Sequence, residues 1–170
     1  MKLKSLNVFF AVLLSIALVS CGTPTKTAGT GDEPVAAVES ESIDLSSIDL
    51  NADSDSGKAG PIKTVFFDFN SANLRSDTRR TLAENAGFLK ANSSVEIQVE
   101  GHCDERGGVQ YNLALGEKRA RAVKRYLVNM GISSSRISTI SFGKERPLAF
   151  GHDEDAWSQN RRGNFVITAK

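Results

Sequence analysis

The sequence is poor in cysteine, in histidine and in long apolar runs, and each scarcity narrows what the chain can be. Two cysteines and two histidines occur among 170 residues, which leaves few ligands for a structural metal site and too few thiols for a disulfide framework. After residue 19 no apolar run approaches the ~20 residues that a membrane-spanning helix needs. Residues 22–60 contain no aromatic side chain. Membrane spans after residue 19 and a disulfide scaffold are therefore excluded.

The N-terminus carries a targeting signal. Two lysines precede the apolar run 8–19, which is too short to span a bilayer comfortably and is typical of a signal peptide. Its ending, LVSC, resembles a bacterial lipoprotein signal, and that resemblance implies cleavage before Cys21 and acylation of this residue. We therefore expect a signal peptide over residues 1–20, a lipidated Cys21, and sorting to the outer membrane because Gly22 follows. Cys103 is then left without a partner in its own chain.

The next segment is predicted to be a linker. Residues 22–60 are small, polar and acidic, with eight acids against two lysines, a composition typical of disorder. A lipidated residue and flexible acidic linker are thus expected over 21–60. The repeat SIDLSSIDLN (42–51) fits plain linker, with a docking motif as the alternative. Residues 61–170 form one domain, with seventeen Lys and Arg against twelve Asp and Glu, and we expect it in the periplasm.

Periodicity predicts the elements of that domain. Alternating or continuous apolar patterns indicate strands, and apolar residues at helical spacing indicate helices. Strands are expected at 62–70, 95–103, 136–144 and 164–170, and helices from about 76 to 91 and 110 to 130, with a helical turn at 153–158. The order β-α-β-α-β-β predicts an α+β fold, a two-layer sandwich with two helices on one sheet. Strands that are joined through helices should run parallel.

The stretch GHCDERGGVQYNLALGEKRARAV (101–123) concentrates reactive side chains. His102, Cys103 and Asp104 are consecutive, so their side chains alternate between faces and cannot close around one metal ion. Cys103 falls on the apolar face of its strand, which disfavours a nucleophile. The basic run 118–125 lacks the aromatic side chains that accompany nucleic-acid binding. Adjacent Asp104 and Glu105 give little support to paired-carboxylate hydrolysis.

A pocket for a charged small molecule is the remaining interpretation. Asn112 and Arg119 lie seven residues apart, on one helical face, and Asp104 sits in a glycine-flanked turn before that helix. A carboxylate and a guanidinium in this arrangement match a zwitterionic amino acid. The alternative is structural: Asp104 caps the helix and Arg119 bridges to an acid such as Glu100. The residues themselves do not separate these two possibilities.

The same stretch resembles the OmpA-like peptidoglycan-binding domain family. The family pattern is a GHxDxxG loop followed by Asn, Leu and Arg-Ala on the next helix, and it is matched here by Gly101, His102, Asp104, Gly107, Asn112, Leu115, Arg119 and Ala120. The entry strand that ends in FDFN followed by a small polar residue (66–71) is similar as well. DERG, FGKERP (142–147) and GHDE…NRR (151–162) are closer to the lipoprotein branch that acts with the Tol proteins. The resemblance covers residues 62–170.

This resemblance implies a binding protein. Members of the family bind the meso-diaminopimelate of the peptidoglycan stem peptide without covalent chemistry, which would tether the outer membrane to the cell wall. By matching position, Asp104 would take the ammonium and Arg119 the carboxylate. Backbone groups around Phe69 and Asn70 would contribute from the first strand, while Asn112 and Leu115 would shape the pocket. No enzyme activity, cofactor, metal or nucleic acid is implied.

The same resemblance implies protein partners, and it also shows where this sequence differs from the family pattern. TolB and other Tol proteins are implied as partners. An OmpA-like wall anchor that does not bind TolB is the nearest alternative, and a peptidoglycan hydrolase is a more distant one. Asn70 stands where many members of the branch carry Asp, and Cys103 replaces the usual Ala or Thr. Arg161 and Arg162 match the final NRR of the family, and the sequence does not tell which of them lies near the ligand.

Overall fold

The computed structural model describes residues 45–170, so the predicted signal peptide and Cys21 lie outside the described residues. In chain order the elements of this part are η1 (Leu45–Ser47), β1 (Val65–Phe66), α1 (Ser76–Ala91), β2 (Glu96–His102), α2 (Val109–Asn129), η2 (Ser134–Arg136), β3 (Ile137–Gly143), α3 (Glu154–Asn160) and β4 (Arg162–Ala169). The predicted α+β class and order of elements are confirmed. The first strand is shorter than expected. No helix within residues 45–170 has the length and apolarity needed to cross a membrane.

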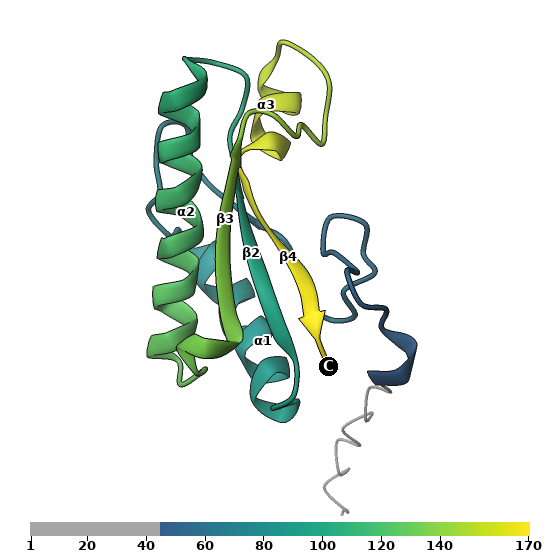
Figure 1. Ribbon diagram of the computed structural model, residues 1–170. Helices are drawn as coiled ribbons and strands as arrows, with labels where there is room; N and C mark the ends of the chain where they lie inside the picture. Colours follow the sequence, from purple (N-terminus) through teal and green to yellow (C-terminus); the bar gives the residue numbers. More distant parts are fainter. Residues whose placement is uncertain (1–44) are drawn as a thin grey trace, which may run out of the picture. The chain divides into compact units, whose positions relative to one another are not determined.

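The four strands form one sheet in the order β1-β4-β2-β3. The strands β2 and β3, which are joined through α2, pair in parallel, as predicted. The strand β4 enters between β1 and β2 and runs antiparallel to both. Figure 1 shows α1 and α2 together on one face of this sheet, with α3 at the end where β2 and β3 finish. That end of the sheet carries the loop between β2 and α2, beside which the candidate site is built.

The core lies between the sheet and the two long helices. Alternate residues of and around β2 are buried (Val95, Ile97, Val99 and Cys103), which is the face that the period of two predicts. The stripe of α2 that the period of 3.6 predicts to face inward is buried at Gly116, Ala120, Val123 and Leu127. Gly131 ends this helix with φ of 95°, the left-handed conformation that a helix C-terminus favours.

Two glycines allow α2 to approach β2 at backbone distance. A Cβ added at Gly101 on β2 would overlap the carbonyl group of Gly116 on α2, and one added at Gly116 would overlap Ser141 Oγ on β3 and approach the Gly101 carbonyl oxygen to 2.7 Å. Since a methyl group cannot be fitted without moving the helix, we expect Gly101→Ala to lower the free energy of unfolding by about 1–3 kcal/mol. Gly87→Ala on α1 is the control, because nothing lies within 4 Å of its added Cβ. Equal urea midpoints for both variants would contradict the close approach.

The segment 45–60, which composition placed in the linker, is packed onto the domain. Ile48, Ala52 and Ala59 are buried in the same apolar cluster as the helices and the sheet. The backbone N–H groups of Asn51 and Ser54 donate to the carbonyl groups of Ile167 and Phe165, each at 2.9 Å. The predicted boundary at residue 61 is therefore too late: the ordered unit includes residues 45–60, beside β4 in Figure 1.

Polar side chains fix the same segment. Asp55 Oδ2 accepts a hydrogen bond from Arg162 Nε at 2.7 Å, and their side chains are 10% and 5% exposed. Ser54 Oγ donates to Asn164 Oδ1 at 2.8 Å. The acidic and serine side chains whose abundance predicted disorder thus pair with buried polar groups on β4.

The two arginines that end the NRR motif have different partners. Arg162 contacts this segment, and Arg161 contacts the loop after β2.

Removing this segment should cost stability. The test compares the unfolding free energies of two chains, one beginning at residue 45 and one at residue 61. The shorter chain should lose about 2–4 kcal/mol of unfolding free energy, because it gives up the burial of Ile48 and leaves Arg162 without its carboxylate. Denaturant unfolding followed by circular dichroism measures the difference. Equal stability of the two chains would show that residues 45–60 are not part of the cooperative fold.

Candidate functional site

The candidate site is built where β2 passes into α2. After His102 the chain makes a loop of six residues, 103–108, and α2 begins at Val109. Gly107 in this loop has φ of 90°, a conformation that glycine adopts without steric cost. The loop is held from the other side by Lys144, whose Nζ donates to the carbonyl oxygens of Glu105 and Gly107 at 3.0 and 2.8 Å.

All six residues predicted to bind the ligand line one cavity of about 180 Å³. They come from three places: the chain after β1, the loop after β2, and the first half of α2. The lining consists of Phe69, Asn70, Cys103, Asp104, Arg106, Gly107, Tyr111, Asn112, Leu115 and Arg119. The residues named by the family resemblance thus share one cavity although they lie up to 50 positions apart in the chain. Their contacts, however, differ from those expected.

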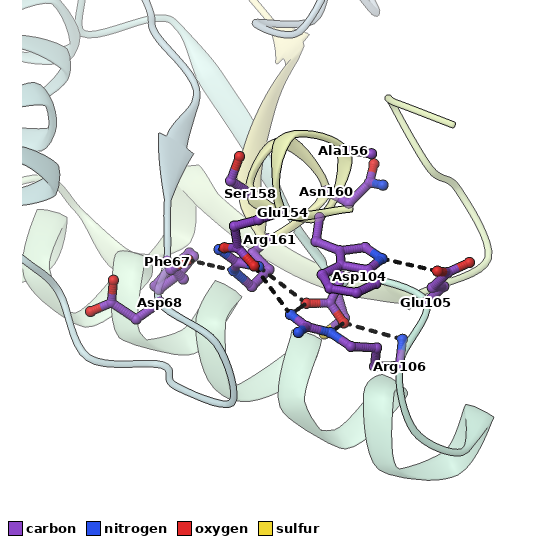
Figure 2. A network of polar contacts seen from close by, with 12 residues as sticks. Phe67, Asp68, Asp104, Glu105, Arg106, Glu154, Ala156, Ser158, Asn160 and Arg161 are labelled. Carbon is purple, nitrogen blue, oxygen red and sulfur yellow. Dashed lines mark hydrogen bonds and ion pairs between the residues drawn. The ribbon is translucent and has the colours of Figure 1, made fainter. Parts of the chain in front are cut away.

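Asp104 is buried and fully engaged within the chain. Its Oδ1 accepts hydrogen bonds from Arg106 N and Nε at 3.1 and 3.2 Å, and its Oδ2 accepts from Arg106 Nη2 at 2.6 Å. Arg161 Nη1 lies 3.3 Å from the same Oδ2. Figure 2 shows both arginines converging on this carboxylate. Burial tends to raise the pKa of Asp104, but the bonds and charge of the arginines outweigh it, so this pKa lies below its ordinary value.

Arg119 has no exposed surface and is bound chiefly to backbone carbonyls. Its Nε donates to Ser71 O at 2.8 Å, its Nη1 to His102 O at 2.7 Å, and its Nη2 to Asp68 O at 3.0 Å. Nη1 also contacts Cys103 Sγ at 3.4 Å. A guanidinium has five N–H groups, and these contacts use four of them. Burial lowers the pKa of Arg119, although a guanidinium stays charged in a protein.

The structural alternative raised from the sequence is wrong in its details. Asp104 does not cap α2, whose N-cap is Gly108 without a side-chain bond. Glu100 does not pair with Arg119; its Oε2 contacts His102 Nε2 at 3.3 Å and accepts from Asn164 Nδ2 at 2.9 Å. Asp104 and Arg119 therefore line the same cavity, and each of them binds groups other than those expected.

The remaining predicted residues divide into framework and lining. Asn112 is buried, and its Nδ2 donates to the Arg106 carbonyl oxygen at 2.9 Å, which fixes the loop. Phe69 is 57% exposed at the cavity mouth. Asn70 has φ of 52° and accepts a hydrogen bond from the Tyr111 hydroxyl. Leu115 is half-buried and supplies apolar lining.

Two contributors were not identified from the sequence, and a third was left undecided between two arginines. Arg106 and Tyr111 lie inside the motif stretch but carry no spacing signal of their own. Arg161 was flagged by the NRR match without a choice between it and Arg162; the structure puts Arg161 on Asp104 and Arg162 on Asp55. Arg161 is also held by the Phe67 carbonyl oxygen at 3.1 Å and by Glu154.

His102 and Cys103 point to opposite sides, as predicted. Cys103 Sγ contacts the Asn112 carbonyl oxygen at 3.4 Å, and burial raises the pKa of its thiol, which keeps it protonated and unreactive. His102 stacks on Phe142 with ring centroids 5.6 Å apart. Within residues 45–170, no three His, Cys, Asp or Glu side chains gather in a way that could hold a metal ion.

Comparison with known proteins places this arrangement in a family. Residues 66–161 match the model of the OmpA family. The peptidoglycan-associated lipoprotein of Pseudomonas aeruginosa is 48% identical over 109 residues, which are 64% of this chain and 64% of that protein. The peptidoglycan-associated lipoprotein of Rhizobium meliloti is 37% identical over 164 residues, or 94% of this chain and 86% of its own length.

Solved structures agree with these relatives. The peptidoglycan-associated lipoprotein of Burkholderia pseudomallei superposes with a TM-score of 0.59 at 43% identity, over 61% of this chain and 88% of that one. The periplasmic domain of Helicobacter pylori MotB gives 0.55 at 21% identity, over 62% and 71% of the two chains, which shows the fold alone. The chain therefore belongs to the OmpA family, in the group of the peptidoglycan-associated lipoproteins.

Proposed function

We propose that this protein binds peptidoglycan without covalent chemistry, through the meso-diaminopimelate of the stem peptide. The observation that carries the proposal is the cavity of about 180 Å³ into which an anionic Asp104 and a cationic Arg119 both face. One end of diaminopimelate is a free ammonium and carboxylate on the same carbon. A site with one charge of each sign recognises that pair and gains little from a singly charged side chain.

The two charges act differently. Asp104 accepts the ammonium at the cavity wall, in competition with the arginines already bound to it. Arg119 is held by its bonds to backbone carbonyls, so it offers the ligand carboxylate a preorganised charge. Exposed Phe69 and Tyr111 flank the opening and supply apolar contact for the aliphatic chain of the ligand. No bond is made or broken, and the chain acts as a binding protein and not as an enzyme.

The setting of this activity is the cell envelope. Cleavage and lipidation at Cys21 would fix the N-terminus in the outer membrane, and the domain would reach the cell wall from there. TolB and the other Tol proteins are the proposed partners, as the group resemblance implies, in keeping envelope layers together during growth and division. The lipoprotein group named by the relatives supports this placement.

Co-sedimentation with purified sacculi from a diaminopimelate-containing bacterium tests the proposal. A soluble form that begins at residue 22 should pellet with the sacculi and release no soluble fragments from them. Asp104→Asn should stay in the supernatant, and Arg121→Gln, which alters an exposed arginine paired with Glu117 on the same helix, should pellet normally. A wild-type protein that remains in the supernatant would refute wall binding, and released fragments would indicate a hydrolase.

A further inference from the structure

The ammonium position of the proposed site is already filled by the protein's own Arg106. Arg106 places three N–H donors on Asp104, at 2.6, 3.1 and 3.2 Å, so that both carboxylate oxygens are engaged. A ligand ammonium that uses Asp104 needs the same oxygens. Figure 2 shows Arg106 and Asp104 facing each other at the base of the loop.

Two aromatic rings hold the same guanidinium. The Arg106 Cζ lies 4.0 Å from the ring centroid of Phe69 and 3.9 Å from that of Trp157, distances at which a cation is attracted by the ring face. Trp157 is itself fixed, because its Nε1 donates to Glu105 Oε1 at 2.9 Å. Asp104, Phe69 and Trp157 together form a slot for a cation, drawn from three separate parts of the chain.

The second arginine on Asp104 is not equivalent. The Arg161 side chain is 7% exposed, whereas that of Arg106 is 30% exposed. Arg161 is anchored by the Phe67 carbonyl oxygen and by Glu154. Beyond Asp104 and the two rings, the Arg106 guanidinium has one further salt-bridge partner within residues 45–170, Glu154 Oε2 at 3.9 Å. Arg106 can therefore swing into solvent while Arg161 keeps the buried carboxylate partly neutralised.

We propose that Arg106 is an internal competitor at this site: it occupies the cation slot in the free protein, and a ligand is admitted only if its ammonium displaces it. This inference rests on the proposed function. A singly charged amine gains too little to replace a guanidinium that has both an ion pair and two ring contacts. A ligand that also brings a carboxylate to Arg119 gains enough. Because every amine pays the same cost of displacement, Arg106 lowers the affinity for all of them, and only a ligand that also reaches Arg119 keeps measurable binding.

Trp157 reports this displacement directly. It is the only tryptophan in the chain, and its ring carries the Arg106 guanidinium on one face. Departure of that cation changes the surroundings of the indole, so its fluorescence emission should change as ligand binds. The emission titration should saturate at the same concentration as a calorimetric one.

The decisive experiment titrates the soluble form from residue 22 with a diaminopimelate-containing muropeptide, in wild type, Arg106→Gln and Arg121→Gln. Arg106→Gln should bind about tenfold more tightly, since the ligand no longer displaces an ion pair and two cation–π contacts. Its Trp157 emission should no longer respond to ligand. Arg121→Gln should match wild type in both measurements. Arg106→Lys, which keeps the charge but not the planar fork, should fall between wild type and Arg106→Gln.

The outcomes separate the two proposals. Equal or weaker binding by Arg106→Gln, with wild-type binding intact, overturns the inference and leaves wall binding standing, with Arg106 either a ligand contact or a structural bond. Binding by Arg106→Gln alone supports the inference in a stronger form, with the slot closed in wild type. Absence of binding in wild type and in every variant overturns the proposed function and the inference together. Equal thermal midpoints of wild type and Arg106→Gln exclude misfolding as the cause.

Discussion

Replacing Arg119 by leucine should destabilise the whole domain, by about 3–5 kcal/mol of unfolding free energy. The guanidinium has no exposed surface, and it satisfies the carbonyl groups of Asp68, Ser71 and His102. Leucine has no donor for any of them, and a buried acceptor that loses its partner costs about 1–3 kcal/mol. The loss should be much larger than any expected from removing a ligand contact at the protein surface.

Urea unfolding of the ligand-free protein measures this effect. Arg121→Leu, two residues further along α2 and 65% exposed, is the matched control and should change stability by less than about 0.5 kcal/mol. Arg119→Lys should also be destabilised, because an ammonium cannot reach three carbonyls that are arranged for a planar fork. Wild-type stability in Arg119→Leu would mean that these hydrogen bonds contribute little. Loss of binding in any Arg119 variant is consequently no proof of ligand contact unless the fold is measured beside it.

Asp104→Asn should abolish muropeptide binding, with a loss of at least about 100-fold, because a buried hydrogen-bonded charge pair typically contributes 2–5 kcal/mol to a complex. The amide keeps the shape of the side chain but presents no charge to the ammonium. Calorimetry gives the affinity, and thermal unfolding is run on the same sample. Binding within about threefold of wild type would remove Asp104 from the site. A folded Asp104→Asn that does not bind is the result we expect, although it should be less stable than wild type because the buried Arg161 loses the charge of its partner.

The pH dependence follows from the direction of the Asp104 shift. Its pKa in the folded protein lies below the ordinary value of 3.8, so the carboxylate stays charged well into the acid range. Affinity should therefore be flat from neutral pH to about pH 5. It should fall only below about pH 4, where protonation of Asp104 removes the charge that binds the ligand ammonium. The stability that Asp104 contributes is present above its unfolded pKa and is lost as the pH falls through the folded one. A midpoint for binding near pH 6 would point to a different group.

Local pattern was enough to predict the elements that frame the site. Burial of one face produces an apolar period of two along β2 and of 3.6 along α2. Residues close in sequence are enough to reveal such a pattern. The motif stretch likewise located the loop between β2 and α2. The cavity lining could be assembled by resemblance because its members lie in recognisable segments.

Long-range bonds set the limits of that prediction. Arg119 reaches carbonyl groups 48 and 51 residues away, so nothing near it in sequence reveals that it is a framework residue as well as a candidate ligand contact. Arg106 meets Trp157 only because α3 is folded back over the loop. The order of residues 45–60 was missed for a related reason: Asp55 and Ser54 have linker-like chemistry, and only β4, more than 100 residues later, supplies their partners.

Recognition of both charges of the ligand is tested by a pair of calorimetric titrations of the wild-type soluble form, one with a diaminopimelate muropeptide and one with its lysine-containing counterpart. The two ligands differ only in the terminal carboxylate and its D-centre. A site built on Asp104 and Arg119 should bind the first ligand and give no measurable heat with the second. Equal binding of both, or no heat from either with a folded protein, would contradict recognition of a zwitterion in this cavity.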